Sequence, residues 1–366
     1  MKKEEDSMKK VAIVSLLLLA ACGGIAEDTI GETSPPPNVG GQAGSSAGGS
    51  AGSMSGSYGS AGSGDSSTES YLTRGEFAIM LVNNTLDYGY FENVPCQSKW
   101  QDVPNDTTLC FAVTALAEAG VEIVYTTDSG DKVVQPENTI PWQEARQLTV
   151  QATGWVPYPD KCLAEEGIPP QGWNAWYAGA LCSRGLLWKN GNDVLVKPEA
   201  GKQFLQNVRD FQGKSATRFD TIEVLANRFL GFKYDEKASC TTTYSDVEPE
   251  TMRCQLTAFM VDKGLAKPFP DGEFHGENTV NSAEYMKLLA YSAQIDTPQC
   301  QSDACAGTAA KNQWYCAYAQ AVCATGVVDS IVPADFIFRD FLTITTIEMK
   351  KYLTKLRPQG QAPRSI

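Results

Sequence analysis

Apolar residues recur at helical spacing between residues 70 and 356, and several of these stripes follow one short start signal. The signal is a Thr or Asn followed three residues later by an acidic residue, as in Thr73–Glu76 and Thr217–Asp220. This is a capping box, in which each side chain accepts a hydrogen bond from the other residue's backbone amide. After Thr217 the apolar positions are Ile222, Leu225, Ala226 and Phe229. Such a stripe is typical of an amphipathic helix, so the pattern predicts a mainly α fold.

An arginine follows the cap residue directly at two of these starts, as Arg74 and Arg218. Capping does not explain it, because a cation is repelled by the positive end of the helix dipole. The matching positions of the other starts hold Trp142, Ser282 and Thr346. The two arginines are therefore candidates for ligand binding, and the alternative is that each pairs with a nearby acidic side chain.

The body of the chain repeats itself at a spacing of about 140 residues. Four residues of the first half return 144 positions later: Cys96, Trp100, Asp102 and Cys110 match Cys240, Tyr244, Asp246 and Cys254. A further four return after 141 positions: Trp173, Tyr177, Cys182 and Gly185 match Trp314, Tyr318, Cys323 and Gly326. Offsets this constant indicate a tandem duplication into unit A, residues 69–212, and unit B, residues 213–356. Each unit is expected to hold a leading helix and two helix–loop–helix modules.

The N-terminus has the pattern of an export signal. Met8-Lys9-Lys10 is a short basic start, and Val11 to Leu19 is an apolar run that is short for a membrane span. Leu19-Ala20-Ala21-Cys22 then resembles the lipobox of bacterial lipoproteins, which implies that residues 1–22 are a signal peptide and that Cys22 is lipidated. The alternatives are an ordinary signal peptide and an uncleaved anchor.

Two segments are not expected to fold. Residues 23–68 are rich in Gly, Ser and Ala, which predicts a disordered linker. Residues 357–366 are expected to form a flexible tail. The linker would hold the helical body away from a membrane surface.

Several motifs of the body resemble the S-layer homology (SLH) domain when they are taken in order. They are Leu72-Thr73-Arg74-Gly75-Glu76-Phe77, the Asp-Val pairs at Asp102 and Asp246, Pro270-Asp271-Gly272-Glu273-Phe274, and a Trp twelve residues before a Gly, as in Trp173 to Gly185. The resemblance covers nearly the whole body. It implies two tandemly duplicated SLH-like helical domains, in which grooves between small modules hold envelope polysaccharide.

The resemblance also implies a set of polymer-binding residues, of which the arginines would bind acidic groups on the polymer. The set is Thr73, Arg74, Glu76, Thr217, Arg218 and Asp220. Free amides of the first helical turn are expected to add to the attraction for an anion.

Ten cysteines remain when Cys22 is set aside, which on an exported chain predicts five disulfides. The repeat suggests the pairs Cys96–Cys110, Cys162–Cys182 and Cys240–Cys254. Cys300 and Cys305 are expected to pair with Cys316 and Cys323, in either order. No metal site is expected, because no Cys-x2-Cys spacing occurs and the single histidine, His275, has no counterpart in the other unit.

The net charge and the single histidine argue against some classes of function. The formal net charge of −13 argues against nucleic acid, which binds basic surfaces. A catalytic serine triad is almost excluded, because the chain has a single histidine, which has no counterpart in the other unit. No cofactor is expected. The aromatic positions are expected to be mostly core, although some could line a sugar-binding groove; they are Trp173, Trp176, Tyr177, Trp314 and Tyr318.

The sequence therefore favours a non-catalytic, lipid-anchored protein of the bacterial cell envelope, on the periplasmic or cell-surface side of a membrane. Its expected partners are cell-wall polysaccharide or peptidoglycan, and the lipid bilayer through the acylated N-terminus. In that role it would tether membrane and wall. One alternative is an envelope scaffold that binds proteins and no glycan. Another is an enzyme that acts on wall glycans with a pair of carboxylates.

Overall fold

The computed structural model describes residues 70–86, 96–169, 172–187, 194–242, 244–267, 269–297, 299–300 and 313–325. All of them belong to one compact unit of the chain, residues 66–366. The signal peptide with Cys22, the linker, the tail and Cys305 lie outside the described residues, so the predictions for them stay predictions.

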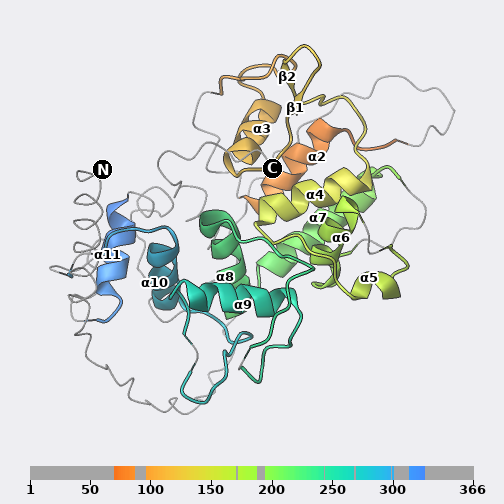
Figure 1. Ribbon diagram of the computed structural model, residues 1–366. Helices are drawn as coiled ribbons and strands as arrows, with labels where there is room; N and C mark the ends of the chain where they lie inside the picture. The colour runs from red at the N-terminus through yellow and green to blue at the C-terminus, as the bar shows by residue number, and fades with distance from the viewer. Residues whose placement is uncertain are drawn as a thin grey trace, which may run out of the picture. The chain divides into compact units, whose positions relative to one another are not determined.

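The described part is mainly helical, as the apolar pattern predicted (Figure 1). The helices of the first half are α2 (Arg74–Thr85), α3 (Thr108–Glu118), α4 (Trp142–Thr153), α5 (Cys162–Glu165), α6 (Trp173–Cys182) and α7 (Pro198–Gln212). Those of the second half are α8 (Arg218–Leu225), its π-helical continuation η2 (Ala226–Leu230), α9 (Met252–Asp262), α10 (Ser282–Ser292) and α11 (Cys316–Ala324).

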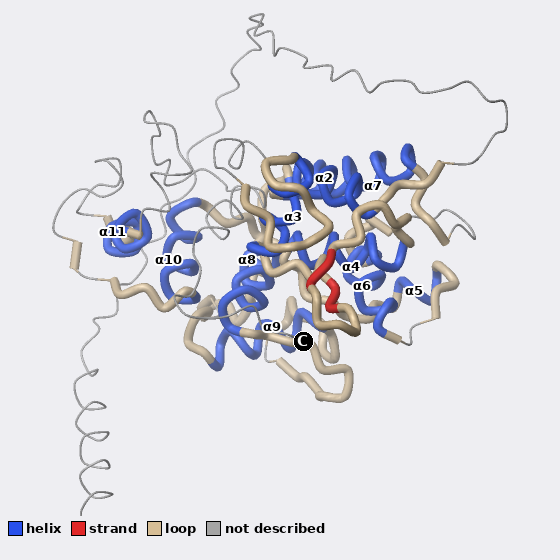
Figure 2. Tube along the Cα trace, turned by 90° about the horizontal axis from the view of Figure 1, so that it is seen from above, coloured by secondary structure: helices blue, strands red, loops and turns tan. Residues whose placement is uncertain are grey.

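Strand structure within the described ranges is limited to one small hairpin. Strand β1 (Tyr125–Thr126) pairs antiparallel with β2 (Lys132–Val133), with Tyr125 opposite Val133 (Figure 2). None of the helices that the structure describes has the length and apolarity needed to cross a bilayer.

Three of the helix starts are complete capping boxes, which confirms the start signal. At α2 the Glu76 amide donates to Thr73 Oγ1 over 3.2 Å, and the Thr73 amide donates to Glu76 Oε2 over 2.9 Å. The same reciprocal pair forms at α8 and at α10. Helix α4 carries Glu144 at the matching position but forms no capping box, because its N-cap residue is Pro141, which has no amide hydrogen and makes no side-chain cap.

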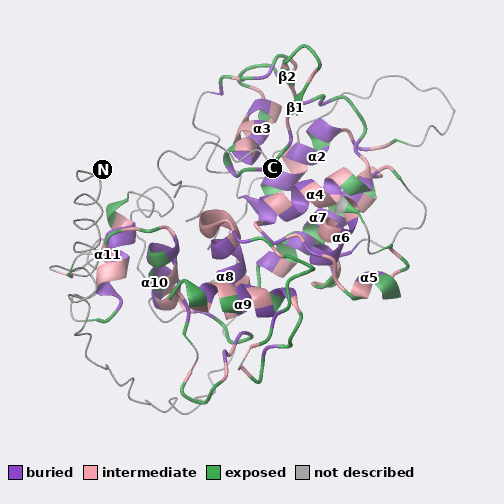
Figure 3. Cartoon of the chain, in the orientation of Figure 1, coloured by how far each residue is buried: buried purple, intermediate pink, exposed green. Residues whose placement is uncertain are grey.

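Side chains from one face of most helices form a shared core (Figure 3). Helix α2 packs on α3 and α7, α4 packs on α6, and α10 packs on α11. The largest fully buried side chains include Trp155, Tyr285, Tyr315, Phe77, Phe204 and Phe274. Burial of this apolar surface is the main stabilising contribution to the fold.

Four disulfides join described residues. Cys96–Cys110, Cys162–Cys182 and Cys240–Cys254 form as the repeat suggested. Cys300 bonds to Cys316, which settles the order that the sequence left open at that residue. Bridges that close loops of this length stabilise a domain by about 3 kcal/mol in the chain-entropy account.

A buried ion pair links α8 to the segment after α6. Arg184 Nη2 lies 2.5 Å from Glu223 Oε2, and the two side chains are 8% and 4% exposed. Glu223 also accepts from the Val156 amide over 2.8 Å, and the Arg184 guanidinium lies 4.4 Å above the Trp155 ring. Burial raises the pKa of Glu223, and the Arg184 charge and the Val156 amide oppose that shift.

Candidate functional site

Arg74 is a core residue. Only 2% of it is exposed. Its Nε lies 2.8 Å from Glu144 Oε1, and its Nη2 donates to the Ile123 carbonyl over 2.9 Å. The guanidinium also lies 4.0 Å above the Tyr125 ring. Arg74 therefore forms an ion pair, which the sequence analysis gave as the alternative to ligand binding.

The acidic partner of Arg74 has a second contact through the same oxygen. The Tyr125 hydroxyl donates to Glu144 Oε1 over 2.8 Å. Burial and this hydrogen bond, together with the negative charge of Glu144, raise the pKa of Tyr125 to about 12. The phenol thus keeps its proton at physiological pH, and the three groups form a closed set.

Arg218 occupies the matching position of α8 in a different setting. It is half-buried, its Nη1 donates to the Phe274 carbonyl over 3.4 Å, and its guanidinium lies 4.4 Å from the centre of the Phe269 ring. Among the described residues, no carboxylate lies within ion-pair distance of it. Burial lowers the pKa of Arg218, whereas the charges of Glu284 and Asp246 raise it, so both carboxylates lie near without binding it.

The residue at the cap of the facing helix explains this difference. At α10 the cap residue is Asn281, whose amide donates to Glu284 Oε2 over 3.1 Å and so holds the carboxylate in a capping box. At α4 the cap residue is Pro141, which has no amide hydrogen to offer. Glu144 is therefore free to reach Arg74, while Glu284 stays at its own helix start.

The first-turn amides of α8 are already used, which corrects the expectation that they attract an anion. The Arg218 amide donates to the Asn278 carbonyl over 2.8 Å, and the Phe219 amide donates to the Gly276 carbonyl over 2.9 Å. The Asp220 amide donates to Thr217 Oγ1 over 3.1 Å. Any attraction for an anion at this helix start must come from the guanidinium.

The other four predicted site residues serve the helix starts. Thr73 and Glu76 cap α2, and Thr217 and Asp220 cap α8. Their polar atoms bind one another, so their visible role is to fix the first helical turn. Arg74 and Arg218 are each held by such a turn, but only Arg218 is partly exposed.

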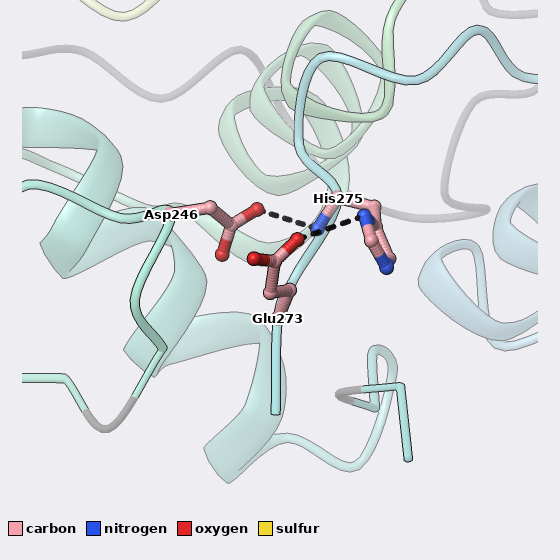
Figure 4. A group of neighbouring side chains, drawn as sticks. All are labelled: Asp246, Glu273 and His275. Carbon is pink, nitrogen blue, oxygen red and sulfur yellow. Dashed lines mark hydrogen bonds and ion pairs between the residues drawn. The ribbon is translucent and has the colours of Figure 1, made fainter. Parts of the chain in front are cut away.

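A group of acidic side chains and His275 lies next to Arg218. The Asp246 carboxylate accepts from the amides of Phe274 and His275 over 2.8 and 2.7 Å. Figure 4 shows Asp246, Glu273 and His275 turned toward one another. The Phe269 ring lies 4.7 Å from the His275 ring, between centroids, and therefore contacts both His275 and Arg218.

Trp314, which lies just before α11, is less buried than the sequence predicted. Trp314 is 52% exposed, so the expectation of a core position is wrong for this residue. The Tyr291 and Tyr318 hydroxyls lie 2.8 Å apart, and Lys287 Nζ lies 5.9 Å from the Trp314 ring. A hollow of about 610 Å³ is lined by residues that follow α10 and by residues of α11 and its C-cap: Ile295, Asp296, Thr297, Gln320, Ala321, Ala324 and Thr325.

No protein-family model matches the chain, and no curated protein matches it. The likeness to SLH domains thus rests on the motifs in the sequence.

Proposed function

We propose that this chain is a non-catalytic lipoprotein of the bacterial cell envelope that binds cell-wall polysaccharide or peptidoglycan and so tethers membrane and wall. The observation that carries the proposal is the state of Arg218. A capping box fixes its backbone, the Phe269 ring supports its guanidinium, and no described carboxylate forms an ion pair with it. A planar guanidinium held in this way suits the carboxylate, ketal-linked pyruvate or phosphate groups of an acidic wall polymer.

We further propose that the body is a pair of SLH-like units, and matching local contacts support this. Asp102 accepts from the amides of Val134 and Gln135, as Asp246 does from the two amides of the second loop. Thr73 bridges to Thr139 as Thr217 bridges to Thr279. The first disulfide of each unit has the same sequence separation of 14.

The aromatic face of α10 and α11 adds a second surface suited to sugars. Exposed rings stack on the apolar faces of pyranose rings, and Trp314 with the Tyr291–Tyr318 pair offers such rings. Lys287 brings a positive charge to this surface. A glycan with acidic substituents fits both this surface and Arg218.

Arg218→Ala should weaken binding of the full-length chain to purified cell-wall sacculi that retain their attached polymers. Each charged hydrogen bond lost costs about 1.5–3 kcal/mol, which corresponds to a loss of about 10- to 150-fold in affinity. Wild-type binding should also weaken as salt is added, because the attraction is between charges. Co-sedimentation with sacculi measures both effects.

Arg209→Ala is the matched control, because Arg209 is an exposed arginine in the last turn of α7. It should bind like the wild type, and both variants should melt within a few degrees of it. Equal binding by Arg218→Ala and the wild type would reject Arg218 as the polymer site. A wild-type chain that stays in solution would instead favour the scaffold function.

Cys22→Ser should abolish lipidation and leave the uncleaved precursor in the cell. The reason is that the lipobox is processed only after the cysteine thiol has been acylated. Detergent-phase partitioning and the mass of the mature N-terminus measure the outcome. A mutant that is released as a normally cleaved, soluble protein would identify an ordinary signal peptide.

A further inference from the structure

Asp246, Glu273 and His275 form a mixed nitrogen–oxygen ligand set. Each offers one ligand atom, and these three atoms lie within 4.8 Å of one another (Figure 4). Asp246 lies in the loop before α9, whereas Glu273 and His275 lie in the loop before α10. Two separate loops therefore converge on one point.

The His275 imidazole faces a carboxylate with each of its nitrogens. Its Nε2 lies 2.7 Å from Asp271 Oδ2, and its Nδ1 lies 3.4 Å from Glu273 Oε2. A neutral imidazole has one N–H, and an ionised carboxylate only accepts. With Nε2–H donated to Asp271, the lone pair of Nδ1 faces the lone pairs of Glu273. A metal ion between Nδ1 and Glu273 Oε2, or a proton on Nδ1, would remove this repulsion.

The surroundings match those of metal-bound histidines. A histidine that ligates a metal almost always donates its other N–H to a carboxylate, carbonyl or water, and ligating carboxylates are themselves hydrogen-bonded. Asp271 is placed to accept from Nε2. The two backbone amides that donate to Asp246 fix the orientation of its carboxylate.

The corresponding loop of unit A shows that the loop fold needs no histidine. There Asp102 accepts from the Val134 amide over 3.0 Å and from the Gln135 amide over 2.6 Å. Gln135 matches His275, and both have positive φ, 55° and 52°. Because glutamine serves equally well in that backbone, shaping the loop does not account for the imidazole at His275.

We propose that Asp246, Glu273 and Nδ1 of His275 bind one divalent transition-metal ion, with Asp271 as the positioning residue behind the imidazole. This revises the expectation of no metal site. One imidazole with two carboxylates suits Zn²⁺ better than Ca²⁺ or Mg²⁺, because imidazole binds transition-metal ions more strongly than it binds these hard cations. Zinc bonds of about 2.0–2.2 Å require the three side chains to close inward by small rotations. Three protein ligands leave a coordination position open to water or an anion.

The test uses the oxidised full-length chain and Zn²⁺ alone, with Ca²⁺ as a second titrant. Calorimetry should give one Zn²⁺ per chain and much weaker binding of Ca²⁺. Because His275 is the only histidine, ¹⁵N-histidine labelling gives one pair of imidazole nitrogen signals. Zn²⁺ should shift the Nδ1 signal strongly and leave Nε2 protonated, and it should raise the melting temperature.

His275→Gln places the residue of the unit A loop at this position and should fold while losing the bound Zn²⁺. Asp271→Asn should weaken Zn²⁺ binding by about 10- to 100-fold, as loss of a positioning carboxylate does. Glu277→Gln removes a neighbouring exposed carboxylate outside the ligand set and should leave the affinity unchanged.

Two results would overturn the site. One is a wild-type Nδ1 signal that does not move when Zn²⁺ is added. This would show that the imidazole is an imidazolium paired with Asp271 and Glu273. The other is Zn²⁺ binding by His275→Gln as tight as by the wild type.

Discussion

Arg74→Ala is expected to lower the free energy of unfolding by about 3–5 kcal/mol, because it removes a buried charge and leaves the mostly buried Glu144 carboxylate without its partner. The Glu144 side chain is only 15% exposed, so water can replace the guanidinium only in part. The loss of the contact with the Tyr125 ring adds to the effect. Urea unfolding followed by circular dichroism measures the change.

Arg218→Ala is the matched comparison, since it changes the same residue at the same place of a capping box. It should cost only about 1 kcal/mol, the strength of a cation–π contact, because no described carboxylate depends on this arginine. Equal losses for the two variants would contradict the distinction between a structural and an accessible arginine. It would also remove the basis for choosing Arg218 as the binding residue.

The features that the sequence predicted well are local. A capping box links residues three apart, and the three predicted disulfides close short loops within one repeat. In such cases the chain can bring the partners together in few ways, so spacing alone carries the prediction. The amphipathic stripes behind the caps predicted the helical class for the same reason.

The environment of each arginine depended on a residue far along the chain. Arg74 meets Glu144 because α4 begins at Pro141, which cannot hold that carboxylate. The matching Asn281 holds Glu284 away from Arg218. The sequence does contain the difference, because one N-cap residue is Pro141 and the matching one is Asn281. It could be used to predict the ion pair of Arg74 only once α4 was known to lie beside α2.

Comparing the two units also gave no prediction for residues that occur in only one of them. His275 was set aside because unit A has no counterpart, although that asymmetry is what distinguishes its loop. Arg184 and Glu223 likewise match Thr325 and Ile79 in the other unit, so the repeat gave no reason to pair them. Their contact joins parts of the chain that lie on either side of the expected unit boundary.

The Arg184–Glu223 pair is therefore one of the contacts that hold the two halves together, and among those that the structure describes it is the one in which both charges are buried. Arg184→Met and Glu223→Leu should each lower the free energy of unfolding by about 3–5 kcal/mol, since each leaves one buried charge unpaired. The double mutant should lose far less than the sum, because neither charge remains.

A residual loss of about 1–3 kcal/mol should persist in the double mutant, because the Val156 amide would be left buried without its acceptor. Glu223→Gln provides the check on this value: its amide oxygen can still accept from Val156, so only the charge is lost. Denaturant unfolding of the four variants and the wild type gives the coupling energy. If the two single losses simply add, the pair does not act as a unit, and the halves are held by apolar packing and by other polar contacts, such as those of Asn227 with the Gly154 and Trp155 carbonyls.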